Sequence, residues 1–303
     1  MQWFLQQLIN GLALGSIYAL IALGYTMVYG VLGFINFAHC DVLMLGAFAA
    51  SFLAAPVARV LAPQSYCGAA VIILLAAGLC ALIGMLIEFL AYRPLRRRPK
   101  LTVLITAIGV SLFLEFTCQH PAVFGAATRP FPKLIPQRDC QWRGLSFNTN
   151  DIGVLLVTVL LLVALWWVVR RTRIGVAMRA VSFNESAAAL MGVNINRVIS
   201  FTFALGSALA AVAGVFYAMR APGIEPLMGV QPGLRAFTAA VVGGIGNLPG
   251  AALGGVLIGL LETFAGGIPG LSDYRDGIAF AILILILLFK PAGLLGKAQV
   301  EKV

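Results

Sequence analysis

Three polar residues that could contact a polar solute lie close together near the start of the chain. Asn36, His39 and Asp41 fall within residues 33–41, between two long apolar segments, and Phe37 lies among them. Polar groups inside apolar spans are candidates for a functional role, because leaving them unused there is unfavourable. Asp41 has a second interpretation, since a carboxylate before an apolar run commonly accepts the free N–H groups of a helix start. The sequence leaves both open.

A second polar group lies in the glycine-rich region of residues 236–266. Asn247 interrupts this region, and Glu262 needs a partner or a wet cavity because an unpaired carboxylate is unfavourable in an apolar arm. Glycines recur four residues apart, at Gly246, Gly250 and Gly254 and again at Gly255 and Gly259. Such spacing favours close helix packing. It is also compatible with a broken helix whose ends face a zwitterionic solute.

The residues that could carry out bond chemistry are missing from recognisable patterns. The chain has two histidines, His39 and His120, and it contains no HExxH, nucleophile or phosphate-binding loop signature. Its five cysteines show no metal-ligand spacing. We therefore expect no catalytic residue, cofactor or metal. Cys118 and Cys140 could pair in an oxidising space, or they could be small buried residues that never meet.

The most polar internal stretch, residues 170–197, predicts a short rigid helix. Ser182 followed by Glu185 matches a capping box, and Gly192 is a typical helix stop. A helix of about nine residues between them, roughly 13 Å long, would carry an apolar face. That face would consist of Phe183, Ala187 and Leu190.

The composition identifies the chain as a membrane protein. Of its 303 residues 61% are hydrophobic and only 11% are charged, and the mean hydropathy is +0.98. Soluble domains carry about 25% charged residues. The net charge of +10 comes from short loops between apolar spans, so it indicates orientation in a bilayer rather than nucleic-acid binding. The fold class expected is an all-α polytopic membrane protein forming a single domain over residues 1–303.

Apolar segments of nearly membrane-spanning length occur along the whole chain. They lie at about 8–30, 42–60, 69–91, 102–118, 152–169, 198–219 and 274–290, with the interrupted region 236–266 in addition. The first arm of that region is too short to cross. We therefore expect eight or nine membrane segments, including one that is broken or re-entrant and that is either surrounded by protein or faces a watery cavity.

Clusters of cations set the expected orientation. They occupy the loop from Arg93 to Lys100, including Arg97, the stretch 170–197, and a tail with Lys290, Lys297 and Lys302. The positive-inside rule places all three in the cytoplasm and the N-terminus outside. The proline-rich loop 119–150 then lies outside as an irregular cap, although Arg129, Lys133, Arg138 and Arg143 weaken the rule there.

Four well-separated segments resemble the branched-chain amino acid ABC transporter permeases of the LivH type. They are residues 5–39, which end in GFINFAH, 87–96 with IEFLAYRPLR, 173–215 with RIGVAMRAVSFNESAAALMGVN, and 233–262 with GLRAFTAAVVGGIGNLPGAALGG. The tail PAGLLGK is similar too. The resemblance therefore covers almost the whole chain.

The resemblance implies a non-catalytic permease subunit in the inner membrane that moves branched-chain amino acids by alternating access. The expected partners are a second related permease, two ATP-binding cassette subunits and a periplasmic amino-acid-binding protein. The polar stretch would dock on an ATPase. Its expected contacts are Arg173, Arg179, Ser182, Phe183, Glu185, Ala187, Leu190 and Gly192, and the substrate pathway candidates are Asn36, Phe37, His39, Asp41, Asn247 and Glu262.

Three alternatives remain at this stage. One is a related permease for amides, urea or other amino acids, since related permeases share these motifs. Another is a self-contained secondary transporter that uses Asp41 and Glu262 to couple ions. An intramembrane enzyme is disfavoured by the missing catalytic patterns.

Overall fold

The computed structural model describes residues 2–62, 64–96, 98–136, 139–142, 145–221 and 223–296, without the side chains of Lys100 and of residues 139–142. Several cations that entered the orientation argument lie outside the described residues, as does the C-terminus: Arg97, Arg138, Arg143, Lys297 and Lys302. The orientation of the tail is therefore an expectation from sequence alone.

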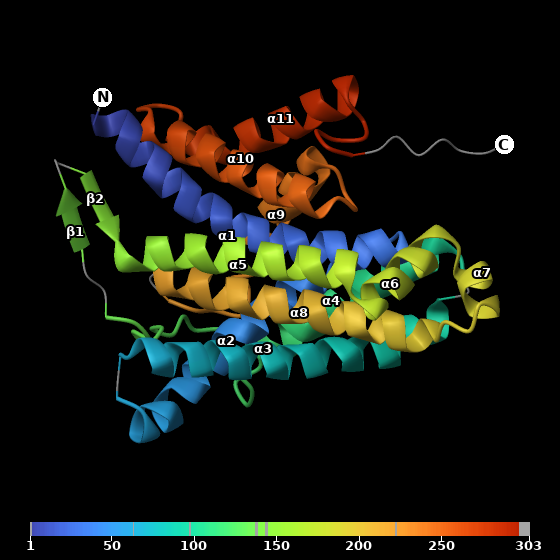
Figure 1. Ribbon diagram of the computed structural model, residues 1–303. Helices are drawn as coiled ribbons and strands as arrows, with labels where there is room; N and C mark the ends of the chain where they lie inside the picture. The colour runs from blue at the N-terminus through green and yellow to red at the C-terminus, as the bar shows by residue number, and fades with distance from the viewer. Residues whose placement is uncertain are drawn as a thin grey trace. The chain divides into compact units, whose positions relative to one another are not determined.

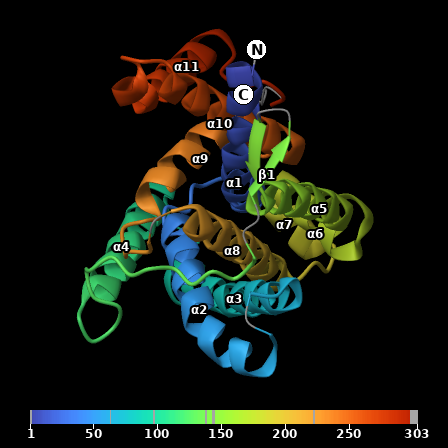
Figure 2. The same ribbon diagram turned by 90° about the vertical axis from the view of Figure 1, so that its left-hand side faces the viewer.

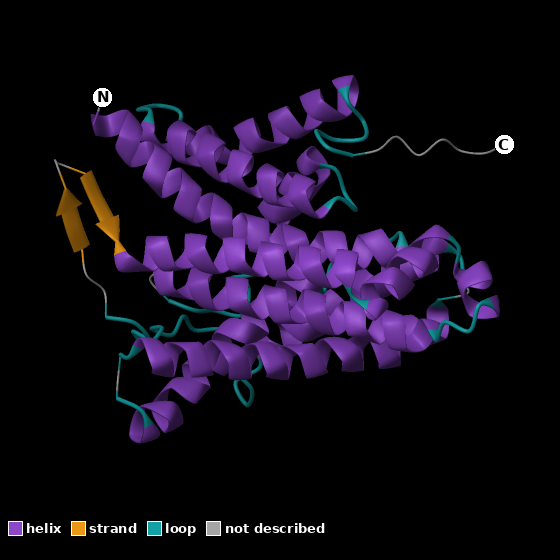
Figure 3. Cartoon of the chain, viewed as in Figure 1, coloured by secondary structure: helices purple, strands orange, loops and turns teal. Residues whose placement is uncertain are grey.

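Helices make up most of the chain, as Figures 1 and 3 show. The α-helices are α1 (Gln2–Leu32), α2 (His39–Val60), α3 (Tyr66–Ile87), α4 (Lys100–Gln119), α5 (Thr149–Arg171), α6 (Arg173–Phe183), α7 (Glu185–Leu190), α8 (Ile195–Arg220), α9 (Val230–Gly243), α10 (Leu248–Gly267) and α11 (Arg275–Phe289). A π-helical turn, η1 (Glu88–Tyr92), and a 3-10 turn, η2 (Arg93–Leu95), continue α3, and the 3-10 turn η3 (Ser272–Tyr274) precedes α11.

Seven helices of the described part are long and apolar enough to cross a membrane: α1, α2, α3 with its two turns, α4, α5, α8 and α10. The expected crossing at 274–290 corresponds to α11, which has 15 residues, and α9 has 14. Both fall short of the roughly 20 residues that span a bilayer unaided. The chain is therefore a multi-pass helical membrane protein, as the composition predicted.

The chain divides into two compact units. Unit 1 contains residues 1–26, 137–163 and 233–303, and unit 2 contains residues 27–136 and 164–232. Because α1 and α5 each pass through a boundary, both helices contribute to both units.

In unit 2 the helices α2, α3 and α8 pack on one another, as Figures 1 and 2 show from two sides. Glycines allow the close approach. A Cβ on Gly46 would overlap the backbone of Ala211, and a Cβ on Gly214 would overlap the carbonyl oxygen of Leu43. The core of this unit is therefore built on backbone contact, the mode by which membrane helices associate when both lipid and side chains are apolar.

In unit 1 the same principle joins α1 to α10. Gly259 lies against Gly15, and Gly255 lies against Ala19, so that no side chain fits between the two helices. On another side of α10, Gly254 meets the carbonyl oxygen of Ala239 in α9. The packing interpretation of the glycine spacing is thus confirmed.

The predicted interruption of residues 236–266 lies between α9 and α10. Gly244 and Gly246 adopt positive φ values of 104° and 91°, which glycine tolerates best. The carbonyl oxygens of Val242 and Gly243, left free where α9 ends, accept hydrogen bonds of 2.8 and 3.1 Å from the N–H groups of Leu294 and Leu295. The chain after α11 therefore satisfies the backbone of the broken segment.

A short antiparallel hairpin lies within the loop that was expected to be irregular, and the fold is otherwise helical in the described residues. The strands β1 (Asp139–Trp142) and β2 (Leu145–Asn148) pair within the loop between α4 and α5. Proline excludes helix from that loop but not a strand that lacks proline, and the sequence argument did not consider one.

Candidate functional site

The first group of site candidates surrounds the connection between α1 and α2. Helix α1 ends at Leu32, and Gly33 turns the chain with a φ of 68°. Asn36 is buried, and its Oδ1 accepts a 2.6 Å hydrogen bond from the hydroxyl of Tyr92 in the π-helical turn. The ring of Tyr92 also stacks on Phe34, with centroids 5.4 Å apart. The connection is therefore an ordered element fastened to η1.

Asp41 does not cap α2. That helix begins at His39, and its N-cap residue, Ala38, makes no side-chain cap hydrogen bond. Asp41 instead lies in the first helical turn, where the helix dipole favours a negative charge. Its buried carboxylate accepts a 2.5 Å hydrogen bond from the Ser111 hydroxyl in α4. The capping interpretation was wrong because the helix starts two residues earlier than it required.

His39 and Phe37 frame the same connection. His39 is the first residue of α2 and is buried, whereas Phe37 is half-buried and packs against the apolar cluster that contains Tyr92 and Phe203. Asn36, Phe37, His39 and Asp41 therefore share one region of unit 2, as their sequence proximity predicted.

Glu262 belongs to a buried charge network in unit 1. Its Oε1 accepts a 2.6 Å hydrogen bond from the Arg235 guanidinium, and its Oε2 accepts one of 2.7 Å from the Tyr18 hydroxyl. The other side of Arg235 contacts the half-exposed Asp276 at 2.7 Å. Four helices, α1, α9, α10 and α11, meet at this node. The sequence argument that Glu262 needs a partner is confirmed, and the partner is a cation.

Asn247 acts as a helix cap. Its Oδ1 accepts from the N–H of Gly250 in the first turn of α10, and its side-chain amide donates to the carbonyl oxygen of Leu295 at 2.6 Å. Both sides of the amide are thus engaged within unit 1. The two pathway candidates of unit 1, Asn247 and Glu262, therefore both form hydrogen bonds within that unit.

The polar stretch 170–197 forms α6, α7 and the start of α8. The capping box is incorrect: Ser182 lies inside α6, and its hydroxyl donates a 2.5 Å hydrogen bond to the carbonyl oxygen of Gly30 in α1. Asn184 is the N-cap of α7 and accepts from the Ala187 N–H at 2.9 Å. Consequently α7 has six residues rather than nine. Gly192, with a φ of 82°, follows it as predicted.

The end of this stretch exposes large apolar side chains. Phe183 is 92% exposed, Leu190 is 89% exposed and Met191 is 85% exposed, whereas Ala188 is buried. Glu185 and Ala187 are also exposed, and Arg173 and Arg179 lie on α6. Large apolar side chains are therefore exposed at the end of α6 and at the end of α7.

A second network joins this stretch to α3. Glu88, fully buried in the π-helical turn, pairs with Arg96 at 2.6 Å and accepts a 2.6 Å hydrogen bond from the Ser200 hydroxyl in α8. Arg96 also donates to the Asn196 side chain at 2.9 Å. Arg93, which is closer to Glu88 in the sequence, lies instead over the ring of Phe89, 5.3 Å from its centroid.

Sequence reasoning missed Tyr18, Tyr92, Ser111 and Arg235. Arg235 did carry a signal, because a lone arginine beside an apolar arm requires a counter-ion. The tyrosines carried none, since each looks like an ordinary apolar-span residue until its hydroxyl partner is known.

Comparison with known proteins gives a match along nearly the whole chain. Residues 7–287 match the family described as branched-chain amino acid transport system / permease component. The chain is 42% identical to the high-affinity branched-chain amino acid transport system permease protein BraD of Pseudomonas aeruginosa, over 99% of this chain and 98% of that protein. It is 40% identical to LivH of Escherichia coli K12, a permease protein with the same description, over the same shares.

A more distant likeness covers part of the chain. The ribose import permease protein RbsC of Haemophilus influenzae is 33% identical over 45% of this chain and 43% of that protein. No solved structure matches the chain. From the extent of the full-length matches, the chain belongs to the family of branched-chain amino acid transport system permease components.

Proposed function

We propose that the chain is the permease subunit of an ATP-driven importer that carries branched-chain amino acids across the bacterial inner membrane by alternating access. The observation that carries this proposal is the match over 99% of the chain to BraD and LivH, both named as high-affinity branched-chain amino acid transport permeases. The subunit performs no bond chemistry, and ATP is hydrolysed by separate ATP-binding cassette partners. A second permease and a periplasmic amino-acid-binding protein complete the assembly.

The docking surface for the ATPase is the exposed apolar end of α6 and α7. Phe183, Leu190 and Met191 project from a short helix pair that is anchored behind them by Ser182 on Gly30. An anchored helix transmits a movement of the ATPase to the membrane helices, whereas a flexible loop would absorb that movement. The cations of α6, Arg173 and Arg179, keep this surface on the cytoplasmic side.

The topology that fits these contacts has the N-terminus in the periplasm and the tail in the cytoplasm. The bond from Ser182 to Gly30 and the bond from Arg96 to Asn196 each require their two segments on one side of the membrane, in agreement with the cation clusters. The hairpin of α9 and α10 then enters from outside as a re-entrant pair or as two crossings. With α11 this gives eight or nine membrane segments.

The substrate pathway runs past the connection of α1 and α2, where Asn36, Phe37, His39 and Asp41 lie. Asp41 offers a buried carboxylate to the substrate ammonium group, since no cation pairs with it among the described residues. Glu262 and Asn247, by contrast, support the pathway from behind, because both are already engaged.

The decisive experiment is uptake of labelled leucine by the reconstituted complex. ATP-dependent uptake that valine and isoleucine inhibit, and that urea, acetamide and alanine do not, supports the proposal. Inhibition by amides or urea instead would establish the related permease class. Uptake by this chain alone, driven by a proton gradient and indifferent to ATP, would establish a secondary transporter. Glu262 argues against that outcome, since its charge is already balanced by Arg235.

The docking surface has its own test. Phe183→Asp places a charge on the exposed apolar surface, and Val123→Asp in the loop between α4 and α5 is the control, because Val123 is also exposed but lies outside both the membrane helices and residues 170–197. The proposal expects Phe183→Asp to abolish ATPase binding in a pull-down from detergent. Unchanged binding and unchanged substrate-stimulated ATP hydrolysis would show that this surface is not the dock.

A further inference from the structure

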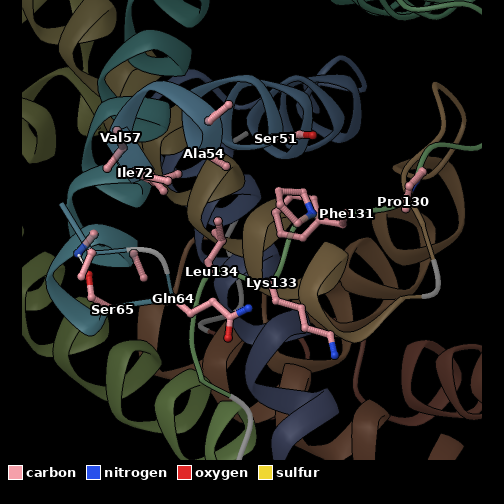
Figure 4. Close-up of a pocket in the computed structure, with 16 residues that line it drawn as sticks. Ser51, Ala54, Val57, Gln64, Ser65, Ile72, Pro130, Phe131, Lys133 and Leu134 are labelled. Carbon is pink, nitrogen blue, oxygen red and sulfur yellow. Dashed lines mark hydrogen bonds between the residues drawn. The ribbon is translucent and has the colours of Figure 1, made fainter. Parts of the chain in front are cut away.

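A cavity of about 550 Å³ opens in unit 2, away from the candidate pathway (Figure 4). Its walls come from the second half of α2, the α2 to α3 connection, the start of α3 and the extended segment of residues 130–134. Most of the lining is aliphatic or aromatic, including Ala54, Val57, Ala69, Ile72, Phe131 and Leu134. Its size falls within the range of about 300–1,000 Å³ that small-molecule sites occupy.

The polar members of the lining are few and lie at its edges. Gln64 and Lys133 extend on one side of the cavity, and Ser51 lies on the other. Ser65 already accepts a hydrogen bond from the N–H of Gly68 and so serves as the N-cap of α3. The cavity therefore combines a long apolar space with one cationic group, Lys133.

The depth of the cavity follows from the two helices that form it. Helix α2 ends at Val60 and α3 begins at Tyr66, and both are of membrane-spanning length. The cavity therefore lies where two crossing helices reach the bilayer surface. Arg59 and Tyr66 are exposed and follow the lining residues Ala58 and Ser65 in sequence, and amphipathic aromatic and basic side chains are typical of this headgroup level.

The cavity is at the opposite end of α3 from the docking surface. The far end of this helix continues through η1 and η2 to Arg96, which bonds Asn196 just after α7. With 30 residues from Tyr66 to Leu95, the span covers about 45 Å at 1.5 Å per residue. The cavity thus faces the leaflet opposite to α6 and α7.

The charge of Lys133 on the cavity lining has no counter-charge within the described part of the chain. Neither Lys133 nor Arg59 has an acidic partner in the part of the chain that the structure describes, whereas Arg96 in the same unit is paired with Glu88. Lys133 on the lining, with Arg59 next in sequence to the lining residue Ala58, complements a molecule with an anionic head and an aliphatic chain. A zwitterionic headgroup carries its own cationic group, so its electrostatic attraction to the protein cations would be weaker.

We propose that this cavity binds a phospholipid with an anionic headgroup. One acyl chain fills the space between α2, α3 and residues 130–134, and the phosphate lies on Lys133 within reach of the Gln64 amide. The lipid then holds the extended segment 130–134 against α2 and α3. This proposal depends on the membrane location of the chain and not on which solute the protein transports.

Native mass spectrometry of the full chain in detergent tests the proposal. The probes are phosphatidylglycerol, phosphatidylcholine, glycerol phosphate and leucine, each titrated separately. We expect phosphatidylglycerol to bind most tightly. Lys133→Gln should weaken its binding about fivefold, the effect of one cation near a headgroup. Ala58→Phe should block it by filling the cavity, because Ala58 lies on the lining and is itself exposed.

Arg197→Gln is the matched control, since it removes an exposed cation at the other end of unit 2. It should leave phosphatidylglycerol binding unchanged. Wild-type binding by both Lys133→Gln and Ala58→Phe would overturn the proposal. So would equal binding of glycerol phosphate, which would indicate a free anion, or displacement of the lipid by leucine, which would indicate a solute site. Thermal unfolding in detergent checks that each variant is folded. If a variant does not fold, Lys133→Glu takes its place in the test.

Discussion

The hydroxyl of Tyr92 donates a 2.6 Å hydrogen bond to Asn36 Oδ1, which joins the π-helical turn after α3 to the connection between α1 and α2. Glu88, four residues earlier in the same turn, is held by Arg96 and Ser200 at the start of α8. One turn of π-helix therefore links the start of α8 with the connection between α1 and α2, which carries the pathway candidates. Single π-helical turns inside α-helices are frequent at functional sites.

Tyr92→Phe should weaken the attachment of the α1 to α2 connection to the π-helical turn while keeping the aromatic packing. The ring remains to stack on Phe34, but the buried Oδ1 of Asn36 loses its donor, at a cost of about 1–3 kcal/mol. We expect a lower unfolding temperature in detergent and a reduced maximal rate of leucine uptake. Tyr66→Phe, on an exposed ring, is the control. If both variants unfold and transport like wild type, Tyr92 does not position Asn36.

Arg235→Ala should destabilise unit 1 strongly. It leaves Glu262 buried without its cation, and loss of one partner from a buried ion pair costs about 3–5 kcal/mol. Asp276→Ala removes the half-exposed partner of the same arginine and should cost less than about 1 kcal/mol. The measurement is the unfolding temperature of the purified chain. Restoration by the double variant Arg235→Met with Glu262→Gln would confirm that the unpaired charge is the cause, and equal effects of the two single variants would contradict it.

The membrane helices were predictable because their signal is local. Apolar runs of suitable length locate α2, α5 and α8 to within a few residues, and the loop expected at 119–150 lies between the end of α4 at Gln119 and the start of α5 at Thr149. The break between α9 and α10 was also visible, because glycine, proline and asparagine interrupt one apolar run. The expected segment at 274–290 likewise corresponds to α11, which begins at Arg275 and ends at Phe289.

The side-chain partners were not predictable because they join distant residues. Tyr18 and Glu262 are 244 positions apart, and Asn36 and Tyr92 are 56 apart. A carboxylate in an apolar segment indicates that a polar partner is needed, but the identity of that partner depends on how the helices pack. The capping box failed for a related reason: the pattern fitted Ser182, but a tertiary hydrogen bond to Gly30 took its hydroxyl.

Asn184→Ala should weaken α7 specifically. Its side chain accepts the Ala187 N–H at the helix start, and removal of such a cap costs about 1 kcal/mol, a large effect for a helix of six residues. We expect weaker ATPase binding in a pull-down, with rescue by Asn184→Ser, which can also cap. Ser182→Ala, in contrast, should leave α7 intact and loosen α6 from α1. A loss of amide protection in α7 with Ser182→Ala, measured by hydrogen exchange, would restore the capping box that the structure excludes.

Gly259→Leu should separate α1 from α10. At this position any side chain meets the backbone of Gly15, which cannot move aside as a flexible side chain could. Overpacking of a tight interface costs about 1–3 kcal/mol, and here the backbones themselves must part, so we expect a loss at or above that range. Gly78→Leu in α3 is the matched control, because nothing lies within 4 Å of the Cβ that it adds. Both changes place the same side chain on a membrane-spanning helix, so they alter hydropathy and helix propensity equally. A lower yield of folded protein and a lower unfolding temperature for Gly259→Leu alone would therefore report backbone contact between the two helices, whereas equal behaviour of the two variants would mean that α1 and α10 do not depend on it.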